Sequence, residues 1–318
     1  MVDDTLAGAG EFAVIDRLVA GRRQPPFVVV GPGDDAAVLA TEGPTAVSTD
    51  MLVEGRHFRL DWSSPHDVGR KAIAQNASDI EAMGGRATAF VVGYGAPGGT
   101  ETAHAVALAD GLWEEAARLG AGIVGGDMVA APQWVVSVTV LGDLGGRPPV
   151  LRSGARPGDV VAVVGQLGWS AAGYALWQNG IDGFAALRRR HLVPEPPYGQ
   201  GGVAARAGAT AMTDVSDGLL ADLGHIAAAS GVHIDLAVAQ VRADLGELAP
   251  AARAVGADAR DWVFGGGEDH ALAATFPGDA PPGWRMIGHV RGPDSGVDAG
   301  AVTIDGAAWS GSAGWQSY

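Results

Sequence analysis

The sequence predicts two domains, each of which combines helices with strands. Its 318 residues exceed what one such domain usually needs, and 47% of them are hydrophobic, which is enough for a sizeable core. Short apolar runs that end near glycine alternate with longer segments of helical periodicity. A segment rich in glycine and proline at 145–149 interrupts this alternation. We therefore expect one domain over residues 1–148 and a second over residues 149–318.

Five strands and two helices are expected in the first domain. The expected strands are residues 27–30, 46–48, 89–93, 122–124 and 134–141. The clearer helix covers residues 64–83, where Ser64 suits the N-cap and Asp67 completes a capping-box spacing. The other helix should follow residue 100 and end at Leu119, because Gly120 favours a helix C-terminus.

The second domain begins with an apolar run of strand length at 160–164. Apolar side chains recur at helical spacing over residues 217–230, which predicts a helix with Asp222 on its exterior. The tail is rich in glycine and alanine but contains Trp309 and Trp315. We therefore expect this tail to be packed rather than disordered.

Charge and cysteine content exclude several classes of function. The formal net charge of −15 disfavours nucleic acid or an anionic membrane as a partner. No apolar stretch reaches the length of a membrane span, and the first residues lack the order of a signal peptide, so we expect a cytoplasmic protein. Because the chain contains no cysteine, it can form no disulfide, thiolate zinc site or cysteine nucleophile.

The chain contains a single lysine, Lys71, and its other basic residues are arginines. A phosphate-binding loop of the GxxxxGK(S/T) type is therefore absent from the sequence. If the protein binds phosphates, it must use backbone amides, arginine or metal ions.

Acidic residues gather next to glycine or small polar residues at five junctions after expected strands. These residues are Asp34 and Asp35, Asp50, Asp127, Asp214 and Asp217, and Glu268 and Asp269. Each junction alone also fits ordinary turn or capping chemistry. Together they favour a ligand site, because ligands collect at strand ends in folds that mix helices and strands. Clustered carboxylates without lysine suit Mg²⁺, which would let an acidic surface accept a nucleotide triphosphate.

Asp79 falls on the apolar face of the 64–83 helix, between Val68 and Ala72, with Asn76 beside it. A carboxylate turned inward is unfavourable unless it is paired or binds a metal. Asp79 should therefore face the same site as the acids at the strand ends. The alternative is that the helix ends early and Asp79 is a solvated loop residue.

The motifs resemble those of the thiamine-monophosphate kinases, within the superfamily of proteins like aminoimidazole ribonucleotide synthetase. They are GAGEFAVI at 8–15, GPGDDAA at 31–37, STDMLVEGRHF at 48–58, NASDIEAMG at 76–84, GGD at 125–127, RSGARPGD at 152–159, HLVPEP at 191–196, DVSDGL at 214–219 and GGED at 266–269. The resemblance extends over nearly the whole chain. The chain departs from the family pattern at His270, where tyrosine is frequent, and in its last residues.

This resemblance implies an α+β N-terminal domain that pairs across a homodimer, an α/β C-terminal domain, and ATP with several Mg²⁺ ions as ligands. The implied metal ligands are Asp34, Ser48, Thr49, Asp50, Asp79, Asp127, Asp214 and Asp217. Of these, Asp34, Asp79, Asp127, Asp214 and Asp217 are the implied catalytic residues. The implied ATP contacts are Gly126, Asp127, Arg152 and Ser216, and the implied substrate contacts are His57, Glu268 and Trp315.

The implied reaction is direct in-line transfer of the γ-phosphoryl group of ATP to thiamine monophosphate, which gives the diphosphate. The acceptor phosphate needs no general base, since it is already largely deprotonated at neutral pH. Two alternatives stay open at this stage: another ATP-dependent synthetase of the same superfamily, and a non-catalytic protein that binds divalent cations.

Overall fold

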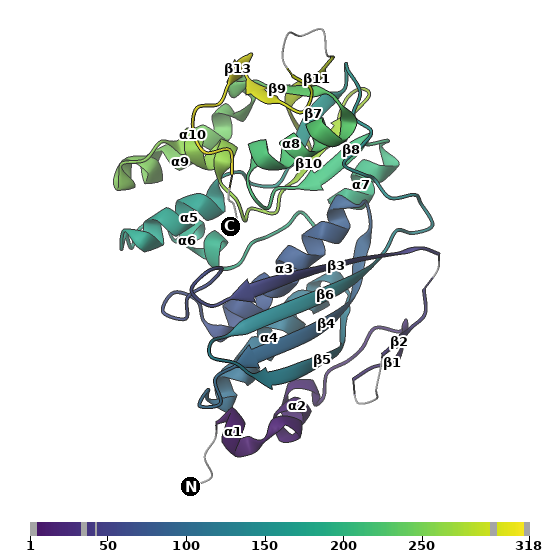
Figure 1. The fold of residues 1–318 in the computed structure, drawn as a ribbon, viewed down its shortest axis with the longest axis vertical. Helices are drawn as coiled ribbons and strands as arrows, with labels where there is room; N and C mark the ends of the chain where they lie inside the picture. The colour runs from purple at the N-terminus through teal and green to yellow at the C-terminus, as the bar shows by residue number, and fades with distance from the viewer. Residues whose placement is uncertain (1–4, 33–36, 42, 293–297, 315–318) are drawn as a thin grey trace. The chain divides into compact units, whose positions relative to one another are not determined.

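Two units make up the chain in the computed structural model, which describes residues 5–32, 37–41, 43–292 and 298–314. The first unit comprises residues 1–80 and 86–146, and the second comprises residues 81–85 and 147–318. Both mix helices and strands, as the sequence predicts (Figure 1). The domain limits expected from the sequence, 1–148 and 149–318, stay a prediction.

A four-stranded sheet forms the centre of the first unit, with the strand order β3-β6-β4-β5. These strands are β3 (Thr45–Val53), β4 (Arg86–Ala96), β5 (Gly122–Ala130) and β6 (Val135–Asp143), and the small hairpin of β1 (Val28–Val30) and β2 (Val38–Leu39) stands apart. Only β4 and β5 run parallel, because helix α4 (Thr102–Leu119) connects them as a crossover. The five strands expected from the sequence lie within or overlap these elements.

Helix α3 (Pro65–Ala82) and helix α4 lie on one side of the sheet, and the short helices α1 (Leu6–Ala9) and α2 (Glu11–Val19) precede it in the chain (Figure 1). The predicted cap of α3 is confirmed, since the Asp67 amide donates to Ser64 Oγ over 3.1 Å. Glycine lets α3 and α4 approach closely: a Cβ on Gly69 would lie 2.2 Å from the Leu108 carbonyl oxygen. Gly120 ends α4 in the left-handed conformation, with φ 65°.

The side of α3 that carries polar residues is buried as well. Lys71 is 2% exposed and its Nζ donates to the His57 carbonyl oxygen over 2.9 Å. Glu81 is 1% exposed and accepts backbone N–H groups of Gly199 and Gly201 over 2.8 and 2.9 Å. The amphipathic pattern of this helix therefore does not distinguish a buried face from a solvent-exposed one. Its charged side chains can be buried because backbone groups from distant segments form hydrogen bonds with them.

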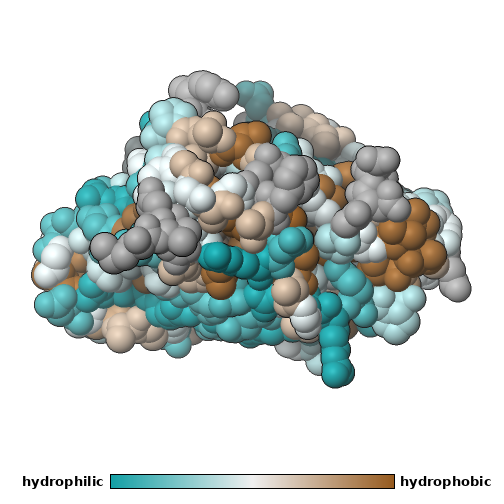
Figure 2. Space-filling model, turned by 90° about the horizontal axis from the view of Figure 1, so that it is seen from below, coloured by the Kyte–Doolittle hydropathy of each residue, from teal (hydrophilic) through white to brown (hydrophobic). Residues whose placement is uncertain are grey.

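The opposite face of the first unit's sheet carries exposed apolar side chains. Along β3, residues of even number are the more buried ones, while Val47 and Met51 are 63% and 52% exposed. Val91 on β4 and Val129 on β5 are 37% and 60% exposed. Figure 2, a view from below that of Figure 1, shows separate hydrophobic patches within a largely hydrophilic surface.

A seven-stranded sheet forms the centre of the second unit, with the order β13-β12-β9-β11-β7-β10-β8. Its strands are β7 (Val160–Val164), β8 (Ala211–Asp214), β9 (His233–Leu236), β10 (Leu272–Phe276), β11 (Arg285–Arg291), β12 (Val302–Ile304) and β13 (Ala307–Ala308). Neighbouring strands are antiparallel except β9 and β12. The predicted run at 160–164 is confirmed as β7.

Helices cover this second sheet, and both of its faces pack against apolar clusters. The helices are α5 (Trp169–Gln178), α6 (Ala185–Leu192), α7 (Gln200–Arg206), α8 (Leu219–Ser230), η1 (Val238–Val241), α9 (Arg242–Val255) and α10 (Ala259–Gly265). Alternate residues of β10 enter the two clusters, Ala273 on one side and Ala274 on the other. Trp309 of the tail packs on the larger cluster, as expected, while Trp315 lies outside the described residues.

Candidate active site

Polar side chains of β3 and α3 meet in the first unit. Ser48 Oγ donates to Asp79 Oδ2 over 2.6 Å, and the Asp50 amide donates to Asn76 Oδ1 over 3.1 Å. The alternative in which the helix ends before Asp79 is wrong, since α3 continues to Ala82. The structure thus brings the predicted ligands Ser48 and Asp79 together, and strand alternation turns Asp50 to the same face of β3 as Ser48.

Thr49 points to the other face of the same strand. Its hydroxyl donates to the Val138 carbonyl oxygen over 2.9 Å and lies 3.3 Å from Thr139 Oγ1. The Thr49 hydroxyl is therefore separated from the group formed by Ser48 and Asp79, and its assignment as a ligand stays a prediction.

Gly126 and Asp127 lie on β5, at the opposite edge of the sheet from β3. Asp127 is exposed, and its Oδ1 accepts the Met128 amide over 2.9 Å. A Cβ on Gly126 would lie 2.2 Å from the Val92 carbonyl oxygen, so only glycine fits at this position. Within the first unit, the sheet thus separates Asp127 from the group at Asp79.

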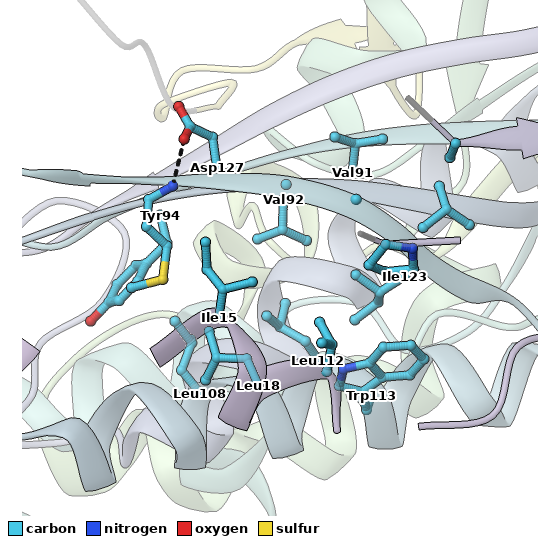
Figure 3. Close-up of a pocket in the computed structure, with 18 of the residues that line it drawn as sticks. Ile15, Leu18, Val91, Val92, Tyr94, Leu108, Leu112, Trp113, Ile123 and Asp127 are labelled. Carbon is cyan, nitrogen blue, oxygen red and sulfur yellow. Dashed lines mark hydrogen bonds between the residues drawn. The ribbon is translucent and has the colours of Figure 1, made fainter. Parts of the chain in front are cut away.

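An apolar cavity of about 500 Å³ adjoins Gly126 and Asp127 in the first unit. Figure 3 shows Leu108, Leu112 and Trp113 of α4 beside Ile15 and Leu18 of α2, below the strands, with the Asp127 carboxylate directed away from them. No motif in the sequence predicts this cavity. Its apolar lining repeats at ordinary helical spacing, so nothing in the sequence distinguishes it from core.

Tyr94 is the polar side chain of that cavity wall. Burial, followed by the charge of Glu54, raises the pKa of Tyr94, so its phenol stays neutral. Its hydroxyl is buried and has no hydrogen-bond partner within the described residues. The cavity therefore offers mainly apolar and aromatic surface to a ligand.

His57, a predicted substrate contact, closes the loop between β3 and α3. Its Nδ1 accepts the Val53 amide over 3.0 Å, and its carbonyl oxygen accepts the Lys71 ammonium group over 2.9 Å. The imidazole is half-buried. Its described contacts are therefore those of a side chain that orders the loop.

In the second unit, Asp214 ends β8 and is 3% exposed. His270 Nδ1 lies 3.1 Å from Asp214 Oδ2, and His270 is itself buried. Ser216 and Asp217 follow in a half-buried turn before α8. Arg152, a predicted ATP contact in the same unit, is exposed, and Asp34 of the first unit lies outside the described residues.

Asp222 is buried, so the prediction that it lies on the exterior of its helix is wrong. Asp222 Oδ2 accepts the backbone amides of Ser216, Asp217 and Gly218 over 3.0, 3.1 and 3.0 Å, and the residue is 1% exposed. The helix starts at Leu219, and side chains of a first turn lean toward the N-terminus, where amides lack helical partners. Asp222 thereby holds the turn that carries two predicted site residues.

Burial, followed by the charge of Asp214, raises the pKa of Asp222 to about 7, and burial raises the pKa of Asp269 to about 7. Both carboxyls therefore keep a proton to higher pH in the folded protein than in the unfolded chain.

The free energy of unfolding should consequently fall as the pH rises from about 4 to about 7. Urea unfolding in magnesium-free buffer measures this fall, which should be smaller in Asp222→Asn than in the parent protein. An identical pH dependence in the two proteins would contradict the assignment.

Within the described ranges, no three histidine or acidic side chains converge closely enough to hold a metal ion. The oxygen donors of Ser48, Asp50 and Asp79 are nevertheless the kind that Mg²⁺ prefers. No helix in the described part of the chain has the length and apolar character needed to cross a membrane.

Comparison with known families gives a match to each half of the chain. Residues 33–144 match the AIR synthase related protein, N-terminal domain, and residues 156–256 match the AIR synthase related protein, C-terminal domain.

Two curated proteins are similar to the chain over nearly its whole length. The thiamine-monophosphate kinase of Mycobacterium tuberculosis is 67% identical over 316 residues, which cover 99% of this chain and 93% of that protein. The thiamine-monophosphate kinase of Corynebacterium glutamicum is 43% identical over 323 residues, with 99% of this chain and 95% of that protein covered.

Solved structures share the fold. The structure described as AaThiL complexed with AMPPCP and TMP has a TM-score of 0.76 and 28% identity, and the match covers 98% of this chain and 97% of that one. The thiamine-monophosphate kinase from Stenotrophomonas maltophilia has a TM-score of 0.76 and 30% identity, with 93% and 95% covered.

Proposed function

Because the chain belongs to the thiamine-monophosphate kinase family, we propose that it uses ATP to phosphorylate thiamine monophosphate to thiamine diphosphate. The observation that carries this proposal is the 67% identity over 316 residues. The similar structure that contains AMPPCP, an ATP analogue, together with TMP supports the same pair of substrates. As a member of this family the chain is a kinase with a phosphate acceptor, which sets aside the non-catalytic alternative and the synthetase alternative.

The proposed reaction is a direct in-line transfer without a phosphorylated enzyme. The acceptor is a phosphate monoester that already carries the negative charge of a nucleophile, so the protein needs no general base. The main obstacles are the electrostatic repulsion between ATP and the acceptor phosphate and the need to align the two groups. The protein's task is therefore to position donor and acceptor.

We assign Mg²⁺ binding to carboxylates and hydroxyls of each unit. Bound Mg²⁺ would supply charge neutralisation for the phosphate oxygens. In the first unit the proposed ligands are Asp34, Ser48, Thr49, Asp50, Asp79 and Asp127, and in the second they are Asp214 and Asp217. The hydrogen bond from Ser48 to Asp79 already orders one oxygen pair of this set.

We assign the apolar cavity of the first unit to the adenine ring. Its aromatic wall and its volume of about 500 Å³ suit a flat heterocycle. Arg152 and Ser216 of the second unit remain proposed ATP contacts.

Acceptor binding is assigned to His57, Glu268 and Trp315. Thiamine carries a cationic thiazolium and an aminopyrimidine, and a carboxylate with an aromatic face suits both. Glu268 supports this proposal because its carboxylate remains one-third exposed beside buried residues.

Phosphorus NMR of the purified protein with ATP, Mg²⁺ and thiamine monophosphate tests the reaction. Thiamine diphosphate and ADP should appear together, and excess chelator should stop both. Product formed with the metal fully chelated, or a stable phosphoprotein that precedes product, would contradict the mechanism.

A homodimer is proposed through the open face of the first unit's sheet, where Val47, Met51 and Val129 are more than half exposed. An apolar sheet face of this kind is unfavourable in water unless a partner covers it. Sedimentation equilibrium should give twice the chain mass, and Met51→Lys should shift the protein toward monomer. A parent protein that sediments as a monomer would refute this proposal.

A cytoplasmic location is also proposed, since ATP is supplied there.

A further inference from the structure

The segment at 268–270 of the second unit adopts a strained backbone. Glu268 and His270 have φ values of 62° and 51°, in the left-handed region that residues with a side chain rarely occupy. Their amides donate to the carbonyl oxygens of Ser216 and Val215 over 2.7 and 2.9 Å. Strain of this kind persists only where the surroundings hold it, and it is common at functional sites.

Asp269, between these two residues, anchors the segment to helix α5. Its carboxylate accepts the amides of Gly168 and Ser170, the latter over 2.8 Å, and the residue is 4% exposed. The first turn of α5 is thereby fixed against the segment that carries Glu268.

A second connection runs from the same turn of α5 back to Glu268. Ser170 Oγ lies 3.2 Å from His191 Nδ1, and that nitrogen lies 3.4 Å from Glu268 Oε2. His191 is 8% exposed, and its ring lies 5.3 Å from that of Tyr174. The Nδ1 edge of His191 thus faces the Glu268 carboxylate at ion-pair distance, and an ionised carboxylate can only accept a hydrogen bond.

We propose that His191 is a positioning residue that orients the Glu268 carboxylate for the acceptor. The inference rests on the proposed role of Glu268 in binding thiamine monophosphate. A carboxylate fixed before binding loses less conformational freedom when the ligand arrives, so it binds more tightly than a free one. Ser170 Oγ contacts the same imidazole nitrogen and so helps to fix the ring beside Glu268.

His191→Leu roughly keeps the volume of the imidazole but removes the nitrogen that contacts the carboxylate. The KM for thiamine monophosphate should rise about tenfold, as expected for loss of a polar contact to a charged group. The KM for ATP should be unchanged. His191→Asn, whose amide can occupy the place of Nδ1, should restore most of the parent value. His233→Leu is the matched control, since His233 is also buried in this unit and lies 2.7 Å from a hydroxyl, Thr303 Oγ1, far along the chain from Glu268.

A double-mutant cycle separates this inference from the proposed function. Glu268→Gln alone should raise the KM for thiamine monophosphate, and adding His191→Leu should raise it little further, because the two residues act together. Additive effects, or equal KM values in His191→Leu and the parent protein, would overturn the positioning role. An unchanged KM in Glu268→Gln would instead refute the proposed role of Glu268. If His191→Leu does not fold, Ser170→Ala gives the same test. We expect a smaller rise in the KM for thiamine monophosphate in this variant. An unchanged KM would contradict the positioning role of His191.

Discussion

Asp79→Asn is expected to lower turnover by about a hundredfold or more, the size of effect seen when one electrostatic contact to a transition state is lost. Asp79 lies within α3, faces β3 and accepts a hydrogen bond from Ser48 Oγ over 2.6 Å. Asparagine keeps the size of the side chain and an oxygen that can accept this bond. It removes the charge that the proposed Mg²⁺ site requires, so the fold should survive while activity is lost.

Asp279→Asn is the matched control for this substitution. Asp279 is exposed and follows the C-terminal end of β10. The predicted site residue Asp214 lies at the other end of that strand, where it pairs with Leu272. Both variants lose one negative charge, and steady-state turnover with saturating Mg-ATP compares them. Equal activity in the two variants would refute the assignment of Asp79 to the metal site.

Local sequence signals predicted the helices α3, α4 and α8, because the causes of these helices are local. The cap of α3 needs only Ser64 and Asp67, three residues apart, and the end of α4 needs only the left-handed Gly120. The apolar runs similarly predicted β7 and the strands of the first unit other than β2. Such features depend on a few neighbouring residues.

Burial of charged side chains on α3 was not predictable in this way. Glu81 is satisfied by amides 118 and 120 positions away, and Lys71 by a carbonyl oxygen 14 positions away. The cavity of the first unit likewise depends on α2 packing on α4, although its lining residues look like ordinary core residues in the sequence. Long-range partners of this kind leave no periodic trace in the chain.

Sequence motifs identified the candidate site residues. They did not predict that the buried carboxyls of Asp222 and Asp269 hold the neighbouring backbone in place by hydrogen bonds. Asp50 and Asp79 stand in recognisable motifs, and the structure places both beside the contact of β3 with α3. Asp269 stands in the GGED motif and Asp222 follows the DVSDGL motif. The inward direction of these two side chains nevertheless follows from where α8 begins and from the strained backbone at Glu268. A shift of the helix start by two residues decides whether Asp222 meets solvent or the amides of the preceding turn.

Asp222→Ala is therefore expected to impair both stability and turnover. It leaves three backbone amides without their acceptor, one of them buried and two half-buried, and a buried donor left unpaired costs about 1–3 kcal/mol of unfolding free energy. The loosened turn carries Ser216 and Asp217, so turnover of the protein that remains folded should fall by about tenfold or more, as a displacement of reacting groups would cause. Asp222→Asn retains one oxygen acceptor and should show smaller losses of both.

Asp258→Ala is the control that separates this effect from ordinary helix capping. Asp258 is an exposed N-cap whose side chain accepts the Arg260 amide over 2.9 Å at the start of α10. Its loss should lower stability by about 1 kcal/mol and leave turnover unchanged. Urea unfolding and turnover per folded molecule distinguish the two variants. Turnover equal to that of the parent protein in folded Asp222→Ala would contradict this prediction. The turn at 216–218 would then function without its hydrogen bonds to Asp222.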